Sequence, residues 1–348
     1  MARDPLSDVP KFRKVLAKWF LECGKDYPWR RTQDPYEILV SEVMLQQTRI
    51  ATVLEKGYYT RFLERFPDPG TLALADDDSL LRAWEGLGYY RRARMLRDAA
   101  RAVTEHHNGT FPDEFDTLIA LPGIGAYTAG ALLSFAFDKP APIVDGNVAR
   151  VLARLFDFRE PVDAGPGRRR IEDWAARLVD PKAPRVFNSA IMELGQTHCA
   201  PGRPDCTACP VSAFCTATDP VSLPIRKPRP RPTQVEEHAI FARRPDGSVL
   251  LERMVGGRRE GFWRLPLRPV AALSRLRCIA TSRYSITRYR VTLHIHEADP
   301  EALPADEPQD GGKTTERWHA PTDLAELPVA APFRRALDSL LAKQHNPA

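Results

Sequence analysis

Apolar residues recur with helical spacing along the chain up to about residue 200. The pattern predicts helices at 11–23, 36–47, 50–66, 77–86, 89–107, 114–120, 126–137, 146–156, 168–179 and 184–197. Asp34 and Pro35 add the helix-start signal of an N-cap residue followed by a proline in the first turn. No convincing strand pattern precedes residue 220, so the first domain is predicted to be all-α.

The pattern changes at residues 219–235, where proline and arginine alternate. Such a segment cannot form a helix and is typical of an extended linker, whose charge suits a DNA backbone. Beyond it, alternating apolar residues predict strands at 235–242, 249–253, 280–285 and 290–295, and a helix at 332–343. The sequence therefore predicts three parts: domain 1–218, linker 219–235, and a smaller α+β domain 236–348.

Length and composition agree with two globular domains, because 348 residues can form two cores. The hydrophobic share is 43% and the charged share 27%, both ordinary for a globular protein. No apolar run approaches the roughly 20 residues of a membrane span, and the start lacks a signal peptide. These features predict a cytoplasmic chain. The net charge of +5 permits nucleic-acid binding.

Five arginines lie within eleven residues, beside two tyrosines at 89 and 90. They are Arg91, Arg92, Arg94, Arg97 and Arg101. Basic and aromatic residues together are typical of DNA-binding surfaces. A solvated helix face explains the run equally well, and the sequence leaves both interpretations open.

The stretch Leu121-Pro122-Gly123-Ile124-Gly125 lies between two predicted helices. Two glycines two apart allow a tight hairpin whose backbone can approach a ligand closely. The following helix offers unpaired N–H groups and its positive dipole end, which suit a phosphate. The alternative is an ordinary turn. A dinucleotide-binding fold is disfavoured because no strand precedes the glycines.

Two acidic residues differ in their expected surroundings. Glu42 lies in a predicted helix rich in apolar residues, which disfavours the ionised form and favours a proton donor. Asp145 lies at a predicted helix start, where the dipole favours the anion. One protonated and one ionised carboxyl group is the combination that cleaves a glycosidic bond. A buried structural acid and a plain N-cap are the competing interpretations.

Four of the six cysteines form a cluster with the spacing Cys199-x6-Cys206-x2-Cys209-x5-Cys215. In a chain expected to be intracellular, a metal site is favoured over disulfides. Four thiolates can hold zinc or a [4Fe-4S] cluster. The spacing fits neither paired zinc-finger cysteines nor the usual ferredoxin runs, and we favour iron–sulfur.

Taken together, the motifs closely resemble the A/G-specific adenine DNA glycosylases (MutY family) of the helix-hairpin-helix glycosylase superfamily. Besides the hairpin and the cysteines, the resemblance rests on Tyr27-Pro28-Trp29-Arg30, Ser41-Glu42-Val43-Met44-Leu45-Gln46-Gln47-Thr48, Gly86-Leu87-Gly88-Tyr89-Tyr90 and Val144-Asp145-Gly146-Asn147-Val148. It covers about residues 10–220. It implies an all-α helix-hairpin-helix glycosylase domain with a [4Fe-4S] loop. Residues 236–345 resemble the family's Nudix-like α+β domain through Val249-Leu250-Leu251-Glu252-Arg253 and Gly261-Phe262-Trp263-Arg264-Leu265-Pro266.

The resemblance implies removal of adenine mispaired with 8-oxoguanine or guanine, after the base is flipped out of the duplex. Glu42 would protonate the adenine and then help to activate water, and Asp145 would stabilise the sugar cation. Tyr127 and Asn147 match assisting positions in the pocket. Related endonuclease III enzymes carry a lysine where Tyr127 stands, and a tyrosine cannot form their imine. The enzyme is therefore expected to be a monofunctional glycosylase, and a monomer.

The resemblance also implies a set of DNA contacts and a lesion-reading loop. The expected DNA contacts are Trp29, Arg30, Gln47, Leu87, Tyr89, Gly123, Gly125, Thr287 and Arg288. Gln47 and Tyr89 match residues that wedge into the duplex. The family loop usually has Phe, then Ser or Thr, then His, whereas this chain has Ile286-Thr287-Arg288. Arg288 thus replaces the histidine, and an arginine can still bind a phosphate or a guanine edge.

Three other functions are weighed against the adenine glycosylase. An endonuclease-III-like lyase is disfavoured by Tyr127 and by the second domain. A non-catalytic DNA-damage binder is disfavoured because Glu42 and Asp145 are both present. A Nudix hydrolase is disfavoured because the run Arg-Glu-x-x-Glu-Glu is missing, so the second domain is expected to bind rather than hydrolyse.

Overall fold

The computed structural model describes residues 5–228, 230–303 and 314–343. Contacts divide the chain into two compact units. The first unit comprises Met1–Arg49, Asp68–Ala73 and Met95–Pro228, and the second comprises Ile50–Pro67, Leu74–Arg94 and Arg229–Ala348. The domain boundaries near 218 and 236 stay a prediction. Position 229 of the predicted linker, and 304–313 and 344–348 of the predicted second domain, lie outside the described residues.

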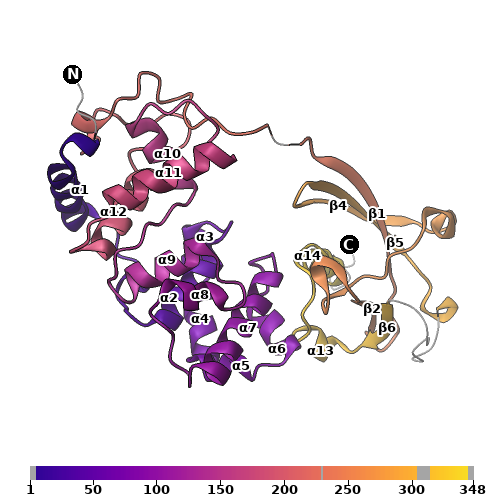
Figure 1. Cartoon of the computed structure of the whole chain (residues 1–348). Coiled ribbons are helices and arrows are strands. Elements are labelled where there is room, and N and C mark those ends of the chain that lie inside the picture. The colour runs from indigo at the N-terminus through magenta and orange to yellow at the C-terminus, as the bar shows by residue number, and fades with distance from the viewer. Residues whose placement is uncertain (1–4, 229, 304–313, 344–348) are drawn as a thin grey trace. The chain divides into compact units, whose positions relative to one another are not determined.

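The described part of the first unit is helical, as the sequence predicts (Figure 1). Its helices are α1 (Val9–Cys23), α2 (Pro35–Leu45), α5 (Pro69–Ala73), most of α7 (Arg91–His106), α8 (Phe115–Ala120), α9 (Ala126–Phe135), α10 (Gly146–Leu155), α11 (Gly165–Leu178) and α12 (Pro184–Gln196). Phe12 and Leu16 of α1 are buried in a core shared with α10, α11 and α12. This core therefore places the start of α10 beside the end of α12.

The single helix predicted at 50–66 is wrong. The structure has two helices, α3 (Ile50–Glu55) and α4 (Tyr58–Arg65). Gly57 separates them with a φ of +60°, a left-handed conformation that ends a helix and that glycine adopts without strain. The next helix, α6 (Asp77–Ala83), begins at the side-chain cap of Asp76. All three helices belong to the second unit.

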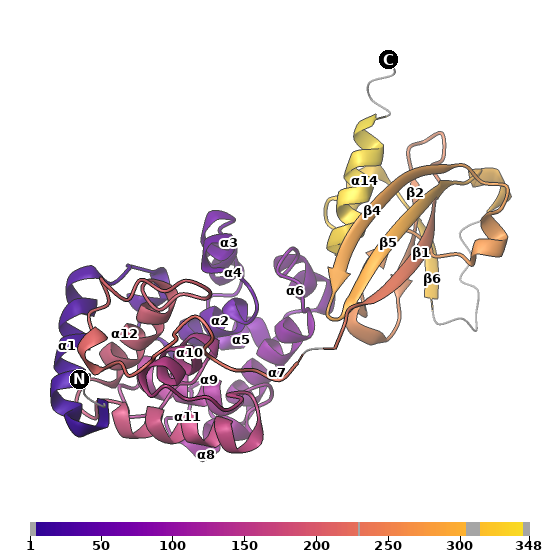
Figure 2. The same cartoon turned by 90° about the horizontal axis from the view of Figure 1, so that it is seen from above.

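The rest of the second unit has two small sheets with helices, which confirms the predicted α+β class. Its elements are β1 (Thr233–Phe241), β2 (Val249–Met254), β3 (Trp263–Arg264), β4 (Cys278–Ile286), β5 (Tyr289–Glu297), β6 (Thr314–His319), α13 (Pro321–Leu324) and α14 (Ala331–Lys343). The sheet orders are β1-β5-β4 and β3-β2-β6, with β1 parallel to β5. Figure 2 shows α14 alongside β4, where the ring of Phe333 approaches that of Tyr284.

Long-range contacts explain why residues 74–94 group with the sheets. Arg253 of β2 pairs with Asp78 of α6 at 2.5 Å, and Arg334 of α14 pairs with Glu85 at 3.1 Å. The ring of Tyr90 packs against that of Phe262 with centroids 3.9 Å apart. A helical pattern in the sequence does not reveal such partners, because it reports only which face is buried.

The arginine run of α7 is mostly structural, so neither sequence interpretation of it holds. Arg92 and Arg97 are buried, Arg94 pairs with Asp77 at 2.8 Å, and Arg101 donates to the carbonyl of Ala73 at 2.9 Å. Arg91 is exposed. Four of the five arginine side chains are therefore buried or bound within the fold, and Arg91 is the exposed member of the run.

Candidate active site and cysteine loop

Glu42 is positioned by α2, whose residues Ile38–Met44 are all buried. The helix begins at the side-chain cap of Asp34, with Pro35 in its first turn, as predicted. The Glu42 side chain is only 6% exposed. Its Oε2 accepts a hydrogen bond of 2.8 Å from the hydroxyl of Tyr127. Tyr127 lies in the first turn of α9, so the hairpin that begins this helix also fixes a neighbour of the acid.

Burial raises the pKa of Glu42 to about 7, because desolvation disfavours the charged carboxylate. The hydrogen bond from Tyr127 lowers this pKa, and the nearby charge of Asp145 raises it. Burial, with the charges of Glu42 and Asp145, raises the pKa of Tyr127 well above its ordinary value. Tyr127 therefore stays a hydrogen-bond donor. A carboxyl group that titrates near pH 7 can both donate and accept a proton.

Asp145 is the N-cap of α10. One carboxylate oxygen accepts hydrogen bonds from the backbone of Asn147 at 2.9 Å and of Val148 at 2.7 Å. The other accepts from Nδ2 of Asn147 at 2.9 Å. Three donors and the positive helix end stabilise the anion. The structure thus brings Glu42, Tyr127, Asp145 and Asn147 together within the first unit.

Arg150 holds this group in place, and the sequence did not single it out. Its Nη2 donates to Oδ1 of Asn147 at 2.9 Å and to the carbonyl of Gly195 at 2.6 Å. Its Nε donates to the carbonyl of Cys199 at 2.8 Å. Burial lowers its pKa, yet it remains a cation. Arg150 follows Asn147 by three positions, so the helical period could have placed both on one face.

The hairpin between α8 and α9 has the geometry that its glycines predict. Gly123 has a φ of +75°, and a Cβ there would lie 2.7 Å from the Cβ of Met95. Gly125 is the N-cap of α9 and has no side chain to occupy the helix start. Both glycines are exposed. The backbone N–H groups at this helix end are therefore open to an anion.

Trp29 and Arg30 lie in a short 3₁₀ turn, Pro28–Arg30. The ring of Trp29 stacks on Tyr27 with centroids 5.3 Å apart. Arg30 forms an ion pair of 2.9 Å with Glu193, which is almost completely buried. Arg30 thus neutralises an internal carboxylate of α12 and joins this turn to the helix. A buried charge without its partner would be costly.

Three expected DNA contacts have a left-handed backbone although they are not glycine. Gln47, Tyr89 and Thr287 have φ values of 62°, 47° and 51°. The other such residues are Asn108, Asp138 and Asp157, whose types tolerate this region better. Strain of this kind is concentrated at functional sites. Among the residues that the structure describes, half of the non-glycine positions with a left-handed backbone therefore coincide with positions chosen from the sequence on other grounds.

Tyr89 and Leu87 lie in the second unit, in a turn held by a buried arginine. Arg92 donates to the carbonyls of Leu87 at 3.0 Å and Gly88 at 3.2 Å. Tyr89 is 46% exposed, whereas Leu87 is 5% exposed. As the structure stands, Tyr89 is available to a ligand and Leu87 packs inside the turn.

Thr287 and Arg288 form the turn between β4 and β5, also in the second unit. Both residues are exposed. The Arg288 guanidinium lies over the ring of Tyr289, 5.2 Å from its centroid, and donates to the Tyr289 hydroxyl at 3.2 Å. The tip of this hairpin therefore presents a hydroxyl and a cation.

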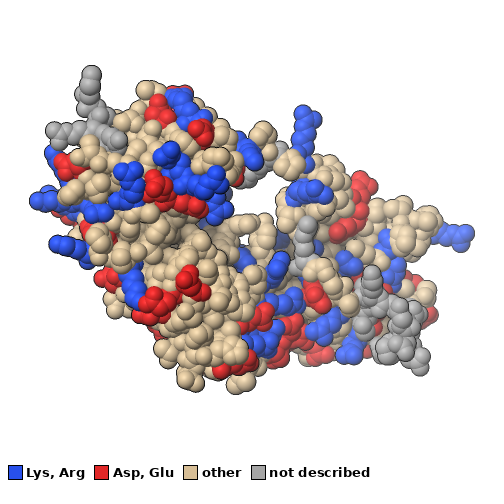
Figure 3. Space-filling model, viewed as in Figure 1, with Lys and Arg blue, Asp and Glu red and all other residues tan. Residues whose placement is uncertain are grey.

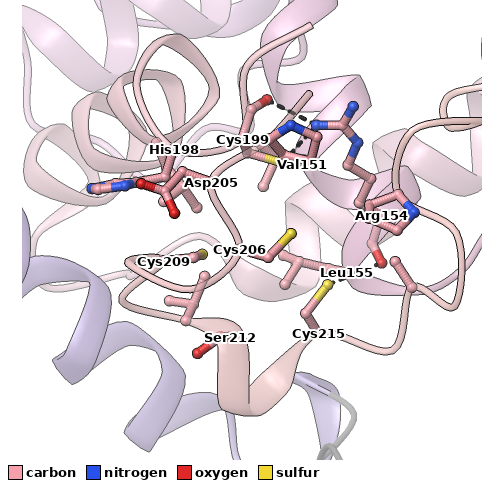
Figure 4. A pocket seen from close by; sticks show the side chains of 15 residues that line it. Val151, Arg154, Leu155, His198, Cys199, Asp205, Cys206, Cys209, Ser212 and Cys215 are labelled. Atoms are coloured by element: carbon pink, nitrogen blue, oxygen red, sulfur yellow. Dashed lines mark hydrogen bonds between the residues drawn. The ribbon is translucent and has the colours of Figure 1, made fainter. Parts of the chain in front are cut away.

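The four cysteines line one cavity of about 170 Å³ between α10, the end of α12 and the loop that follows (Figure 4). They are Cys199, Cys206, Cys209 and Cys215, and none of them forms a disulfide. The short 3₁₀ helix Ser212–Phe214 precedes Cys215. Phe214 is buried in the core beside Phe12, so the loop has an apolar anchor.

The four thiol groups form a donor set suited to a metal group. Because they line one cavity of about 170 Å³, they can hold zinc or a larger iron–sulfur group.

Arg154 of α10 is 2% exposed and contacts the same loop. Its Nη1 lies 3.4 Å from Sγ of Cys199 and donates to the carbonyl of Ala200 at 2.9 Å. Its Nε donates to the carbonyl of Leu223 at 3.2 Å. These hydrogen-bond partners are carbonyl oxygens and a sulfur rather than carboxylates. A buried cation needs nearby negative charge, which thiolates around a metal group supply.

Charged side chains of both signs are spread over the face shown in Figure 3, with basic ones gathered over the α10–α11 region of the first unit. Arg168, Arg169 and Arg170 of α11 are exposed. Every helix among the residues that the structure describes is too short or too polar to cross a lipid bilayer.

Residues 40–176 match the family model described as HhH-GPD superfamily base excision DNA repair protein. The chain is 41% identical over 247 residues to the adenine DNA glycosylase of Rattus norvegicus, covering 68% of this chain and 48% of that one. It therefore spans about half the length of this curated relative.

Solved structures show the same fold for the helical part. A thermostable thymine-DNA glycosylase aligns with a TM-score of 0.55 and 28% identity, over 60% of this chain and 96% of that one. An endonuclease III in a non-covalent complex with DNA aligns with a TM-score of 0.51 and 25% identity, over 61% of this chain and 95% of that one. With the family match and the curated relative, these similarities identify the chain as a member of the helix-hairpin-helix (HhH-GPD) superfamily of base excision DNA repair proteins, in its adenine DNA glycosylase (MutY) family.

Proposed function

We propose that the chain is a monofunctional DNA glycosylase in base excision repair. It removes adenine paired with 8-oxoguanine or guanine. The observation that carries the proposal is the pair of unlike carboxyl groups. Glu42 is buried with a pKa of about 7, and Asp145 is an anion held by three donors. The similarity to the adenine DNA glycosylase of Rattus norvegicus supports adenine as the base.

The hydrogen bonds of Glu42 assign a position to its proton. Tyr127 donates to Oε2, so the proton of the neutral acid is on Oε1. With adenine flipped out of the duplex, Oε1–H protonates N7. The C1′–N9 bond then breaks, its electrons move to the base, and positive charge develops on the sugar. Asp145 stabilises that cation, water attacks C1′, and the Glu42 carboxylate accepts the water's proton.

Tyr127 supports a monofunctional reaction. Its phenol hydroxyl contacts Glu42 at 2.8 Å and cannot form the imine that a lysine forms with a sugar aldehyde. A lyase that cuts the strand needs such an imine. The solved endonuclease III complex is with DNA, which supports DNA as the partner here.

A glycosylase assay separates these reactions. Duplexes holding adenine opposite 8-oxoguanine or guanine should release adenine, and the strand should break only after alkali cleaves the abasic site. Strand breaks without alkali, together with borohydride-trapped enzyme–DNA adducts, would contradict the monofunctional reaction. Release of a damaged pyrimidine but not of adenine would contradict the substrate.

We propose that Cys199, Cys206, Cys209 and Cys215 hold a [4Fe-4S] cluster. Four cysteines around one cavity of about 170 Å³, with a spacing that matches neither paired zinc-finger cysteines nor ferredoxin runs, suit a multinuclear group. When bound, the cluster supplies a structural cross-link within the loop. Through the Cys199 carbonyl, Arg150 joins this loop to Asn147 and so to Asp145. The loop thereby helps to position the anion.

Purified protein should be brown and contain about four iron atoms per chain. Cys206→Ser should lower the iron content and the absorbance near 400 nm, because one of four ligands is lost. The matched control is Cys23→Ser, which changes an exposed cysteine outside the loop and should retain the iron. A colourless protein with one zinc per chain would contradict the cluster.

We propose that the Thr287–Arg288 turn reads the base opposite adenine. Both residues are exposed at the hairpin tip. The left-handed backbone of Thr287 costs free energy, and it persists only where the surrounding structure holds the turn in this conformation. The hydroxyl of Thr287 can form a hydrogen bond with 8-oxoguanine that it does not form with guanine. The predicted Nudix-like domain would thus bind without hydrolysing.

Thr287→Ala should lower the preference for 8-oxoguanine over guanine by roughly 2- to 10-fold, the value of one hydrogen bond of about 0.5–1.5 kcal/mol. Thr287→Ser keeps the hydroxyl and should retain the preference. The measurement is the ratio of single-turnover rates on the two duplexes. An unchanged ratio in Thr287→Ala would place lesion reading elsewhere.

A further inference from the structure

The sheet β1-β5-β4 has one face rich in imidazoles. Residues alternate between faces along a strand, and Val291, Leu293 and Ile295 of β5 are buried in the core. His294 and His296 therefore lie on the other, more open face. In the register of β1 with β5, His238 lies directly beside His294. Glu236 lies two residues before His238 and so shares its face.

Three of these side chains converge. Ligand atoms of Glu236, His238 and His294 all lie within 4.8 Å of one another. Within the part of the chain that the structure describes, it is the only such group of three or more His, Cys, Asp or Glu residues. The rings of His238 and His294 are stacked, with centroids 4.9 Å apart and an interplanar angle of 17°.

Hydrogen bonds from the neighbouring residues assign the ring tautomers. Nδ1 of His296 lies 3.5 Å from the Leu276 carbonyl, which can only accept, so this nitrogen carries the proton. Nε2 of neutral His296 is then an acceptor, and it lies 3.3 Å from Nδ1 of His238. His238 therefore donates from Nδ1 and keeps a lone pair on Nε2.

A hydrogen bond to a neighbouring strand fixes the tautomer of His294 in the same way. Its Nδ1 lies 3.3 Å from the hydroxyl of Thr281 on β4, which can accept its proton and leave a lone pair on Nε2. A ring whose far nitrogen donates to a fixed acceptor is the usual arrangement around metal-binding histidines. Each ring thus keeps one nitrogen lone pair, and one ligand atom from each ring lies within 4.8 Å of the other and of a carboxylate oxygen of Glu236.

We propose that Glu236, His238 and His294 form a binding site for a divalent transition metal ion, Zn²⁺ in the first instance. Two imidazoles and one carboxylate suit zinc rather than magnesium or calcium, which prefer oxygen ligands. Zinc bonds of 2.0–2.1 Å would place the ligand atoms about 3.4 Å apart. Small side-chain rotations bring them from within 4.8 Å to that distance. Glu236 is exposed, so its side chain can rotate toward the ion. A water completes a tetrahedral set.

The ion would connect β1 to β5 near the middle of both strands. These are the strands whose pairing is parallel, so no short turn joins them. His296 acts as a positioning residue, since it orients His238 through the 3.3 Å contact. The site lies entirely in the second unit, apart from the cysteines and from Glu42, and it does not depend on the proposed glycosylase activity.

Equilibrium dialysis of the full-length protein against Zn²⁺, followed by metal analysis, tests the site. The double variant His238→Ala/His294→Ala should bind one zinc per chain fewer than wild type at the same free zinc concentration. His106→Ala changes an exposed histidine of α7 in the first unit and should bind as wild type does. All three proteins keep the four cysteines, so the difference reports only the histidine site.

Single variants measure how much each residue contributes to the affinity for zinc. Glu236→Gln should weaken zinc binding by on the order of 100-fold, and His296→Gln by about 10- to 100-fold as a positioning residue. Since Glu236 is exposed, its variant should fold normally, which circular dichroism checks. Equal zinc binding in wild type, the double variant and Glu236→Gln would overturn the proposal, as would the absence of any histidine-dependent zinc in folded wild-type protein.

Discussion

Glu42→Gln should lower the rate of adenine removal by about 10²- to 10⁴-fold, the usual contribution of a general acid, while duplex binding is retained. Glutamine keeps the shape of the side chain and can still accept the hydrogen bond of Tyr127. It cannot deliver a proton to the base. The measurement is a single-turnover rate beside a binding curve on the same mispaired duplex. A loss of binding as large as the loss of rate would make Glu42 structural instead.

Glu37→Gln is the matched control, because Glu37 lies on the same helix but outside the buried group. Its rate should equal that of wild type. Wild-type rates should also fall as the pH rises through about 7, since the pKa of Glu42 is raised from 4.5 to about 7 by burial. A pH-independent rate between pH 6 and pH 8 would contradict the acid role.

The same raised pKa predicts an effect on stability. Below pH 4.5 Glu42 is protonated in both the folded and the unfolded protein, so it does not change the free energy of unfolding there. As the pH rises through 4.5 to 7, the unfolded protein ionises first, so the folded state loses stability. Above pH 7 this cost is roughly 3 kcal/mol, at about 1.4 kcal/mol per pKa unit. Glu42→Gln should therefore stabilise the protein at pH 8 and not at pH 4.

Asp145→Asn should lower the rate by about 10²- to 10³-fold, because it removes a charge placed where positive charge develops. The asparagine oxygen can still accept from the backbone of Asn147 and Val148, so α10 keeps its cap. The contact with Nδ2 of Asn147 is lost, at a cost of about 1 kcal/mol. The expected result is a folded protein that binds the duplex and reacts slowly.

Asp76→Asn controls for the cap itself. Asp76 caps α6 and accepts from the backbone of Ser79 at 2.8 Å, and asparagine is an equally good N-cap. Its rate should be unchanged. If Asp145→Asn reacted as fast as Asp76→Asn, Asp145 would be a cap and nothing more.

The candidate site could be predicted largely because its chemistry is local. A helix start with Asp145, a hairpin with Gly123 and Gly125, and closely spaced cysteines are each readable in a few consecutive residues. The burial of Glu42 could also be predicted, since Ile38, Leu39, Val40, Val43, Met44 and Leu45 make most of the helix around it apolar. The helical period could have placed Arg150 on the face of Asn147, but a buried arginine such as Arg150 or Arg154 has the same sequence appearance as an exposed one, so neither burial was predicted.

By itself, then, the sequence determined the helical first part, the α+β character of the second, the residues able to donate and accept protons, and the four thiols. Those properties depend on short-range periodicity and on side-chain chemistry. Only the tertiary structure decided that Tyr127 contacts Glu42, that Arg92 and Arg97 are internal, and that imidazoles from β1 and β5 meet on one sheet face. These outcomes depend on contacts between residues far apart in the chain, which burial and strand register determine and local pattern does not.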